Sequence, residues 1–248
     1  MNILLCGCMG RMGRAVTAAA TDDAVIAAGV DMVAGDAAYP IYAHPADCNE
    51  SVDVIVDFSN PAALAEELAY AVANRIPAVI CTTGLSEEQT AALHKAAESI
   101  PVFFSGNMSL GVSVLAALTK KAAAILGDGF DIEIIEMHHN QKLDAPSGTA
   151  LMLANAAKEG VAYEPTYIYD RHDRRQKRDP REIGISAVRG GTIVGEHQVI
   201  FAGKDEVINL THRAQSREIF AVGALRAARF LLGKPAGMYN MEDLVNEV

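Results

Sequence analysis

A glycine-rich turn between an apolar strand and a helix constrains the fold of this chain more than any other feature. Residues 2–6 form a short apolar run, which is typical of a strand buried on both faces. Glycines follow at positions 7, 10 and 13, and residues 14–20 are predicted to form a helix. Such glycines let the backbone approach a pyrophosphate, which the helix N-terminus attracts. The pattern predicts a Rossmann-type nucleotide-binding domain.

The glycine turn alone is a weak signal, because the fingerprint Gly-x-Gly-x-x-Gly is met only at Gly10 and Gly13. Such a turn can also be purely structural. Its context favours function, since a second strand is predicted over residues 25–30 and Asp31 stands at its end. An aspartate in that place can accept hydrogen bonds from the ribose hydroxyls of a dinucleotide.

Strands and helices continue to alternate through the first 107 residues. Strands are predicted at 52–58, 78–81 and 102–105, and helices at 61–74 and 86–98. This order predicts a mostly parallel sheet covered on both faces, with ligands bound beyond the carboxyl ends of the strands. Small or polar residues end each strand and together indicate a cofactor groove: Gly7, Asp31, Asp57-Phe58-Ser59, Thr82-Thr83-Gly84 and Gly106-Asn107.

Composition limits the possible partners. The chain has 248 residues, half of them hydrophobic, and a formal net charge of −10, which argues against a nucleic-acid surface. All four cysteines are expected to be free thiols, and the spacing Cys6-x-Cys8 does not suit a zinc site, so no metal is expected. We expect no membrane-spanning run and no signal peptide, and therefore a cytoplasmic protein without a membrane partner.

The residues that carry chemistry gather in residues 133–150, after a strand predicted at 132–137. His138, His139 and Lys142 fall within five residues, and the turn at Asp144-Ala145-Pro146 follows. Ser147 stands where a helix N-cap is expected, so the amides of Gly148 and Thr149 would offer an anion site. Taken singly, the two histidines could be an ordinary surface pair, and the residues from Ser147 could be an ordinary helix cap. Together they favour a proton-transfer site for an acidic substrate.

The rest of the second half predicts a different architecture. Helices are expected at 112–126, 149–158 and 219–232, and the last of these has an apolar face suited to returning onto the first domain. Short glycine turns join strands predicted at 183–189, 194–202 and 207–211, which indicates an antiparallel region. Residues 171–181 carry five arginines and one lysine. Most of these side chains are expected in a solvated loop, although one or two could close over a dianionic substrate.

The stretch from Glu136 to Ala150, Glu-x-His-His-x-x-Lys-x-Asp-Ala-Pro-Ser-Gly-Thr-Ala, resembles the signature of the 4-hydroxy-tetrahydrodipicolinate reductase (dihydrodipicolinate reductase) family. The glycine turn and residues 189–197 and 212–217 are similar to that family too, so the resemblance covers nearly the whole chain. It implies an α/β fold: a Rossmann domain over 1–107 and 217–248, and an inserted α+β domain with a largely antiparallel or mixed sheet over 108–216. The inserted sheet is implied to form a homotetramer.

The resemblance also implies an activity. The family reduces 4-hydroxy-tetrahydrodipicolinate to tetrahydrodipicolinate with a nicotinamide cofactor and loss of water, in lysine and diaminopimelate biosynthesis. By carry-over His138 and Lys142 handle protons, His139 binds substrate, and Gly148 and Thr149 hold a substrate carboxylate. The implied cofactor-binding residues are Gly7, Cys8, Met9, Gly10, Arg11, Met12, Asp31, Cys81, Thr82, Thr83, Ser105, Gly106, Asn107 and Met108. Cys81 stands where the family often has glycine, and Ser105-Gly106 replaces the usual pair of alanines.

Physical chemistry agrees with such a reaction. Reduction of a cyclic imine dicarboxylate needs a nearby cation and a proton donor, and a lysine beside an imidazole can be tuned toward neutral pH. Asp31 favours NADH because its charge repels a 2′-phosphate, and Met32 and the following Val33-Ala34-Gly35 add no cation. NADPH remains possible through Arg11 and Arg14. The alternatives are another two-domain NAD(P)-dependent oxidoreductase and, ranked lower, a redox sensor that binds dinucleotide without turnover.

Overall fold

The computed structural model describes residues 1–33 and 35–247. Ala34, which was expected to add no cation beside Asp31, and Val248, the last residue of the expected first domain, lie outside the described residues. The chain divides into two compact units, one formed by Met1–Leu110 with Glu218–Val248 and the other by Gly111–Arg217. The domain boundaries expected from the sequence lay after residues 107 and 216.

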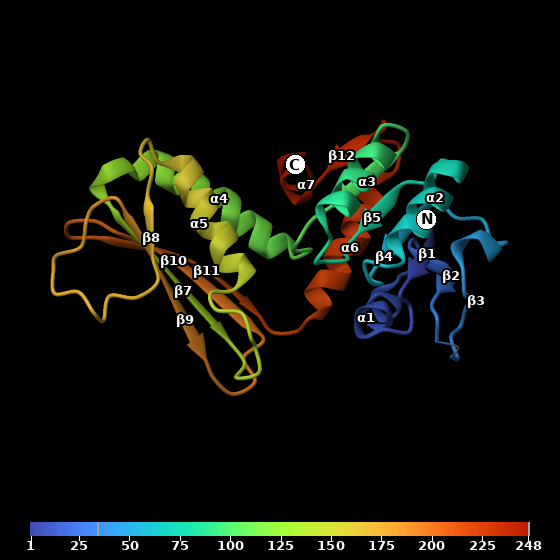
Figure 1. Ribbon diagram of the computed structural model, residues 1–248, viewed down its shortest axis with the longest axis horizontal. Coiled ribbons are helices and arrows are strands. Elements are labelled where there is room, and N and C mark those ends of the chain that lie inside the picture. The colour runs from blue at the N-terminus through green and yellow to red at the C-terminus, as the bar shows by residue number, and fades with distance from the viewer. Residues whose placement is uncertain (34, 248) are drawn as a thin grey trace. The chain divides into compact units, whose positions relative to one another are not determined.

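The first unit is built on a seven-stranded sheet in which every strand pair is parallel, with the order β12-β6-β5-β4-β1-β2-β3 (Figure 1). The expected Rossmann-type sheet is thereby confirmed. The short strands β3 and β12 were not predicted, because two or three residues carry too little pattern. The strands are β1 (Asn2–Cys6), β2 (Val25–Val30), β3 (Ile41–Tyr42), β4 (Val54–Asp57), β5 (Ala78–Ile80), β6 (Pro101–Phe104) and β12 (Gly237–Tyr239).

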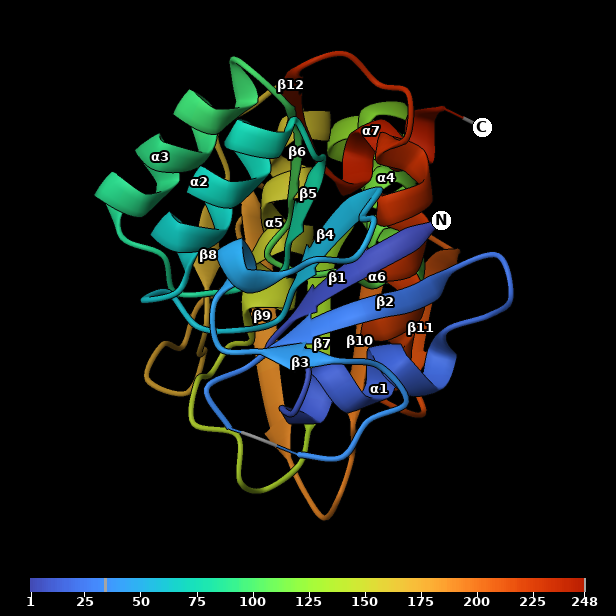
Figure 2. The same cartoon turned by 90° about the vertical axis from the view of Figure 1, so that its right-hand side faces the viewer.

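Helices cover both faces of this sheet (Figure 2). Ile3 and Leu5 of β1 face one core cluster, together with Val16 of α1 and Ala224 of α6, while Leu4 faces the other cluster with residues of α2 and α3. Burial on both faces explains why these strands are continuously apolar. The elements are α1 (Arg11–Ala19), η1 (Pro45–Asp47), α2 (Leu64–Asn74), α3 (Glu87–Ala97), α6 (Glu218–Leu231) and α7 (Met241–Asn246).

The second unit holds a mixed five-stranded sheet with the order β11-β10-β7-β9-β8. The expected largely antiparallel or mixed sheet is confirmed, but residues 183–189 and 194–202, which a glycine turn joins, are not neighbours in it. Strand β7 lies between them, parallel to β9 and antiparallel to β10, so the Gly190-Gly191 turn crosses the end of β7 (Figure 1). Only the β10–β11 pair is the expected hairpin. The strands are β7 (Asp131–His138), β8 (Thr166–Ile168), β9 (Glu182–Arg189), β10 (Gly195–Ala202) and β11 (Val207–Ala214).

Helices α4 (Leu110–Leu126) and α5 (Gly148–Gly160) pack on this sheet, and the short turn η2 (Gly127–Gly129) follows α4. Leu115 of α4 and Leu153 of α5 join Ile134 and Phe201 in the core of the unit. By length and composition, the segment Leu110–Gly129 is long and apolar enough to cross a membrane. The expectation that the sequence contains no such segment is therefore wrong. Leu115 and Ala123 of this segment nevertheless lie in the core of the second unit.

The arginine-rich segment between β8 and β9 is anchored rather than free. Arg171 lies 2.8 Å from Glu133, Arg174 2.7 Å from Glu182, and Arg178 2.7 Å from Asp131. The hydrogen bond from Arg174 lowers the pKa of Glu182 to about 2, against the effect of burial. The expectation of a mostly solvated set of side chains is therefore wrong for these three arginines. Charge composition could not reveal their partners, because those lie on distant β7 and on β9.

Candidate active site

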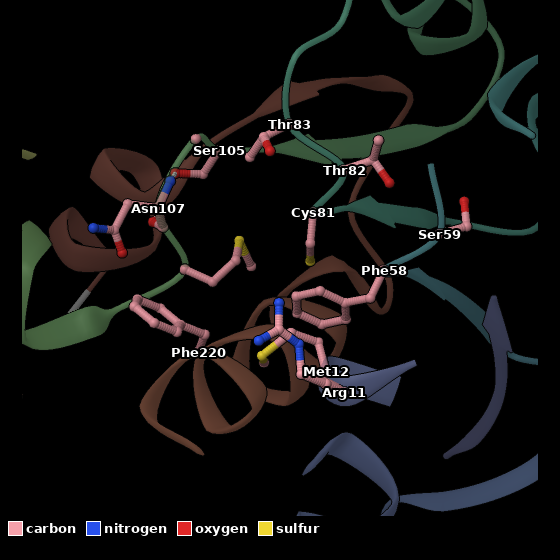
Figure 3. A pocket seen from close by; sticks show the side chains of 12 residues that line it. Arg11, Met12, Phe58, Ser59, Cys81, Thr82, Thr83, Ser105, Asn107 and Phe220 are labelled. Atoms are coloured by element: carbon pink, nitrogen blue, oxygen red, sulfur yellow. Dashed lines mark hydrogen bonds between the residues drawn. The ribbon is translucent and has the colours of Figure 1, made fainter. Parts of the chain in front are cut away.

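A cavity of about 510 Å³ opens at the carboxyl ends of the strands of the first unit. Figure 3 shows Arg11, Met12 and Phe58 at one end of it and Ser105 and Asn107 at the other. Phe220, at the start of α6, was not foreseen, because no local pattern indicates which residue of a distant helix reaches the groove. The lining residues are Arg11, Met12, Phe58, Ser59, Cys81, Thr82, Thr83, Ser105, Gly106, Asn107, Met108 and Phe220.

A second cavity of about 540 Å³ lies beside the glycine turn and is lined by Met9, Gly10, Arg14, Asp31, Val33, Gly35 and Asp36. The carboxylate of Asp31 accepts the amide of Met9 at 2.9 Å and the amide of Val33 at 3.0 Å, which fixes its orientation. Arg14 donates from Nε to the carbonyl of Met9 at 3.1 Å. Asp36 was missed, since nothing in its neighbourhood suggested a ligand contact.

Gly7 and Cys8 line neither cavity. Gly7 has a φ of +72°, and a Cβ there would lie 2.5 Å from the carbonyl oxygen of Phe58, so glycine is required by the close backbone approach. The Cys8 side chain packs into the core, and burial, assisted by the charge of Asp31, raises the pKa of its thiol to about 11. Both residues thus shape the turn that presents Met9 and Gly10.

The two cavities suit a dinucleotide. Gly106 borders the first cavity, and a Cβ at that position would meet no atom within 4 Å, so the backbone there is open to a ligand. Asp31 carries a carboxylate at the end of β2, where ribose hydroxyls can donate to its remaining lone pairs. Arg11 and Arg14 add cations for phosphate groups. Among the described residues, no group of three or more His, Cys, Asp or Glu side chains is placed to hold a metal ion.

A buried pair of carboxyl groups lies beneath the first cavity. Asp57 and Glu67 are 0% and 2% exposed, and Ser59, which lines the cavity, donates from Oγ to Glu67 at 2.9 Å and from its amide to Asp57 at 2.6 Å. Burial, and next the charge of Asp57, raise the pKa of Glu67 to about 8, and burial also raises the pKa of Asp57. The pair therefore retains a proton at neutral pH, and this proton supplies the hydrogen bond between the side chains of Glu67 and Asp57.

The second unit brings the histidine motif into one polar cluster at the end of β7. His138 Nδ1 lies 2.6 Å from Oε2 of the fully buried Glu136, and Arg189 of β9 binds both oxygens of that carboxylate, at 2.8 and 2.7 Å. Burial lowers the pKa of His138, as do the charges of Lys142 and Arg189, whereas Glu136 opposes this shift. Glu136 and Arg189 were not among the expected site residues, because the contact joins two strands far apart in sequence.

Ser147 joins this cluster to helix α5, whose N-cap it forms as predicted. Its Oγ accepts the amide of Ala150 at 3.1 Å and its own amide donates to Glu136 Oε1 at 3.0 Å. The same Oγ lies 2.9 Å from His197 Nε2, and the His138 and His197 rings are 5.1 Å apart. Burial, and next the charge of His138, lower the pKa of His197 to about 4. His197 is therefore neutral at physiological pH, and its tautomer sets whether Nε2 accepts the Ser147 hydroxyl or donates to its oxygen.

The other expected residues lie around this cluster. Lys142 forms an ion pair with Asp144 at 2.8 Å, and His139 Nε2 lies 3.5 Å from Arg217. Gly148 begins α5 and is exposed, and a Cβ there would meet no atom within 4 Å. Thr149 is half-buried in the same first turn. The helix start presents amide donors, and Lys142 and Arg217 add positive charge to the same region, which is the chemistry that an anionic ligand would require.

The fold and the two cavities define a two-unit protein with a Rossmann-type nucleotide-binding unit. The matches to known proteins make its class more specific, a nicotinamide-dependent oxidoreductase. The chain belongs to the dihydrodipicolinate reductase family. The family model described as "Dihydrodipicolinate reductase, N-terminus" matches residues 1–108, and the one described as "Dihydrodipicolinate reductase, C-terminus" matches residues 111–245.

Similar proteins agree with this membership. A protein named 4-hydroxy-tetrahydrodipicolinate reductase from Caldanaerobacter subterraneus subsp. tengcongensis is 49% identical over 100% of this chain and 99% of its own. One of the same name from Clostridium tetani is 46% identical over 99% and 97%. A dipicolinate-bound dihydrodipicolinate reductase from Paenisporosarcina sp. TG-14 has the same fold, with a TM-score of 0.81, 23% identity and 97% of each chain covered. Aspartate dehydrogenase from Thermotoga maritima is a more distant fold neighbour, with a TM-score of 0.53, 14% identity and 94% and 97% covered.

The buried Asp57–Glu67 pair makes the free energy of unfolding depend on pH, and the raised pKa of Glu67 fixes the direction of that dependence. An unfolded chain releases the Glu67 proton near pH 4.5, while the folded protein holds it to about pH 8. The free energy of unfolding therefore falls as pH rises through this interval. Glu67→Gln, which can accept from Ser59 and donate to Asp57, should raise the unfolding temperature at pH 9 by at least about 2–4 °C, and change it little at pH 5.

Differential scanning calorimetry at both pH values measures this difference. Glu66→Gln is the matched control, because the neighbouring carboxylate is 49% exposed and should give no such pH-dependent gain. A Glu67→Gln protein whose unfolding temperature runs parallel to that of the parent from pH 5 to pH 9 would show that the two carboxyls do not share a proton.

Proposed function

We propose that this chain reduces 4-hydroxy-tetrahydrodipicolinate to tetrahydrodipicolinate with a nicotinamide cofactor and loss of water, in lysine and diaminopimelate biosynthesis. The observation that carries the proposal is the family match along both units, 1–108 and 111–245, which includes the complete histidine motif. The alternative of another two-domain oxidoreductase shares only the fold, as the 14% identity to an aspartate dehydrogenase illustrates. A redox sensor would need neither His138 nor the anion site.

The cofactor would be held by the two cavities of the first unit. Met9, Gly10 and Asp31 would hold the adenosine and phosphate side, and Cys81, Thr82 and Asn107 the nicotinamide side. Met12, Thr83, Ser105, Gly106 and Met108 would complete that wall, and Arg11 would face the phosphates. When bound, the reduced nicotinamide supplies a hydride, and the protein orients it.

The second unit would bind the substrate and supply the proton. Gly148 and Thr149 would hold one carboxylate at the start of α5, and His139 with the neighbouring Arg217 would contact the other. His138, whose Nδ1 faces Glu136, would donate from Nε2, and Lys142 would stabilise the charge that develops on the substrate. Loss of water needs no net proton, because the departing hydroxyl gains one while the adjacent ring carbon releases one, and either of these two groups could move that proton.

The sheet of the second unit also supports the implied homotetramer. Along β7 and β10, buried residues that face the helices alternate with half-buried ones on the other face. That face carries Ile135, Met137 and Ile200, and apolar side chains at such a place are suited to a second copy of the chain. The cytoplasmic location stays a prediction.

Removal of the proposed proton donors should abolish most of the turnover. His138→Ala and Lys142→Met should each lower kcat by roughly 100- to 10,000-fold, the contribution of general acid catalysis, and leave cofactor affinity unchanged. Lys158→Met is the matched control, because Lys158 on α5 makes only an exposed ion pair with Glu164. Cofactor oxidation is followed at 340 nm with enzymatically made substrate. No turnover by the parent protein would refute the activity, and near-normal kcat in both variants would refute the assigned roles.

The second cavity supports a preference for NADH over NADPH. Asp31 and Asp36 both line it, and their charges would repel a 2′-phosphate, while Arg14 leaves NADPH possible. Met32 follows Asp31 and is 83% exposed, so an arginine could replace it without disturbing the core. One charge-assisted contact is worth about 1.5–3 kcal/mol, so kcat/KM should favour NADH by about tenfold or more, and Met32→Arg should move the ratio toward NADPH.

Steady-state kinetics with both cofactors test this preference, with Met32→Gln as the control of similar length without charge. A parent kcat/KM for NADPH equal to or above that for NADH would contradict the role given to Asp31. An equal shift in the arginine and glutamine variants would show that charge is not the cause.

A further inference from the structure

We propose that Glu136 is a positioning residue for the reaction: it holds His138 with Nε2 as the proton-donating nitrogen and favours the protonated imidazole. The proposal rests on the function inferred above. It adds a role for a carboxylate that contacts neither substrate nor cofactor in that scheme, and for Arg189, which holds the carboxylate in place.

The geometry leaves Glu136 one orientation. Its Oε2 accepts from Arg189 at 2.8 Å and lies 2.6 Å from His138 Nδ1, while Oε1 accepts from Arg189 at 2.7 Å and from the amide of Ser147 at 3.0 Å. The side chain is fully buried. Burial raises the pKa of Glu136, but the hydrogen bonds from Arg189, His138 and Ser147 lower it below its usual value, so the group is an anion at neutral pH.

An ionised carboxylate can only accept hydrogen bonds, so His138 Nδ1 must carry a proton in both ring states. In the imidazolium, the transferable proton is then on Nε2. After Nε2–H is broken and the proton has passed to the substrate, the neutral ring keeps Nδ1–H bonded to Glu136. The carboxylate thus selects the tautomer without taking a proton itself, as the aspartate of a Ser-His-Asp triad does.

Gly195 keeps the space beside Nε2 open. An added Cβ at this first residue of β10 would lie 3.1 Å from His138 Nε2, closer than ordinary van der Waals contact. The two ring nitrogens therefore have different surroundings: Nδ1 is held by a buried carboxylate, and Nε2 faces a glycine.

The charges around His138 explain why an anion is needed there. The groups that face the ring are Glu136 on its own strand, Arg189 on β9, Lys142 in the following turn and His197 on β10. Burial and the charges of Lys142 and Arg189 lower the pKa of His138. Within this set Glu136 is the one anion, so it is the group that opposes the loss of the proton the reaction needs.

Glu136 also couples the imidazole to the anion site. Ser147 donates its amide to Glu136 and caps α5, whose first turn presents Gly148 and Thr149. One carboxylate thereby sets the position of the proton donor and of the helix start. Loss of its charge should therefore affect proton transfer first and substrate binding second.

Glu136→Gln tests the proposal, with Glu133→Gln as the matched control. Glu133 lies on the opposite face of the same strand and accepts from Arg171 and Arg178, so its replacement also breaks a partly buried ion-pair network, but away from His138. Glu136→Gln should lower kcat by up to roughly 10,000-fold, as does replacing the aspartate that orients the histidine of a Ser-His-Asp triad, with a smaller rise in KM. In its kcat–pH profile, the limb set by deprotonation of His138 should move to lower pH, while Glu133→Gln keeps the parent profile.

A measurement on the unmodified protein keeps the proposal testable if Glu136→Gln fails to fold. Nitrogen-15 NMR of the histidine rings, with the His138 signal assigned from its loss in His138→Gln, should show neutral His138 protonated on Nδ1. Protonation on Nε2, a parent-like kcat and pH profile in Glu136→Gln, or equal losses in the two glutamine variants would each overturn the proposal. An inactive parent would instead refute the proposed function and leave the ring measurement unaffected.

Discussion

The polar cluster of the second unit is organised around one ion pair, between the buried carboxylate of Glu136 and the half-buried guanidinium of Arg189. Their two-pronged contact joins β7 to β9, and the same carboxylate accepts the Ser147 amide that begins α5. Removal of one partner from a buried pair typically costs about 3–5 kcal/mol, because the other charge is left without compensation. A hydrophobic pair of equal volume could stabilise the core equally well. We therefore interpret the charges as retained for what they orient, namely the imidazole of His138 and the helix start.

The first unit leaves a polar groove at the edge of a sheet whose central strands are buried on both faces. Glycine at position 7 allows the close approach to Phe58, and the amides of Gly7 and Met9 are fixed by Val30 and Asp31. Beneath the groove, Asp57 and Glu67 retain a proton, so the wall holding Ser59 does not carry two adjacent charges at neutral pH. The shape of the groove thus depends on backbone packing, and the charge of its wall depends on the Asp57–Glu67 pair. Asp57 was expected at the groove, but its pairing with Glu67 was not.

Local signals predicted much of this molecule. The apolar runs located the longer strands of the first unit, because burial on both faces leaves a continuous pattern, and the Ser147 cap was visible from a serine after a proline turn. Contacts between distant residues were not predictable in the same way. The glycine pair at 190–191 suggested a hairpin, but β7 takes the place between β9 and β10. A single sequence does not show which charged or aromatic side chains meet across a sheet. For this reason the contacts of Arg189, Phe220 and Arg171 were not predicted.

We propose that the cluster around His138 and the start of α5 form the dicarboxylate site. A crystal structure of the protein with NADH and the planar dicarboxylate pyridine-2,6-dicarboxylate tests it most directly. We predict that one carboxylate accepts from the amides of Gly148 and Thr149 and that the ring lies within hydrogen-bonding reach of His138 Nε2. A dicarboxylate bound away from both His138 and the first turn of α5 would contradict the account.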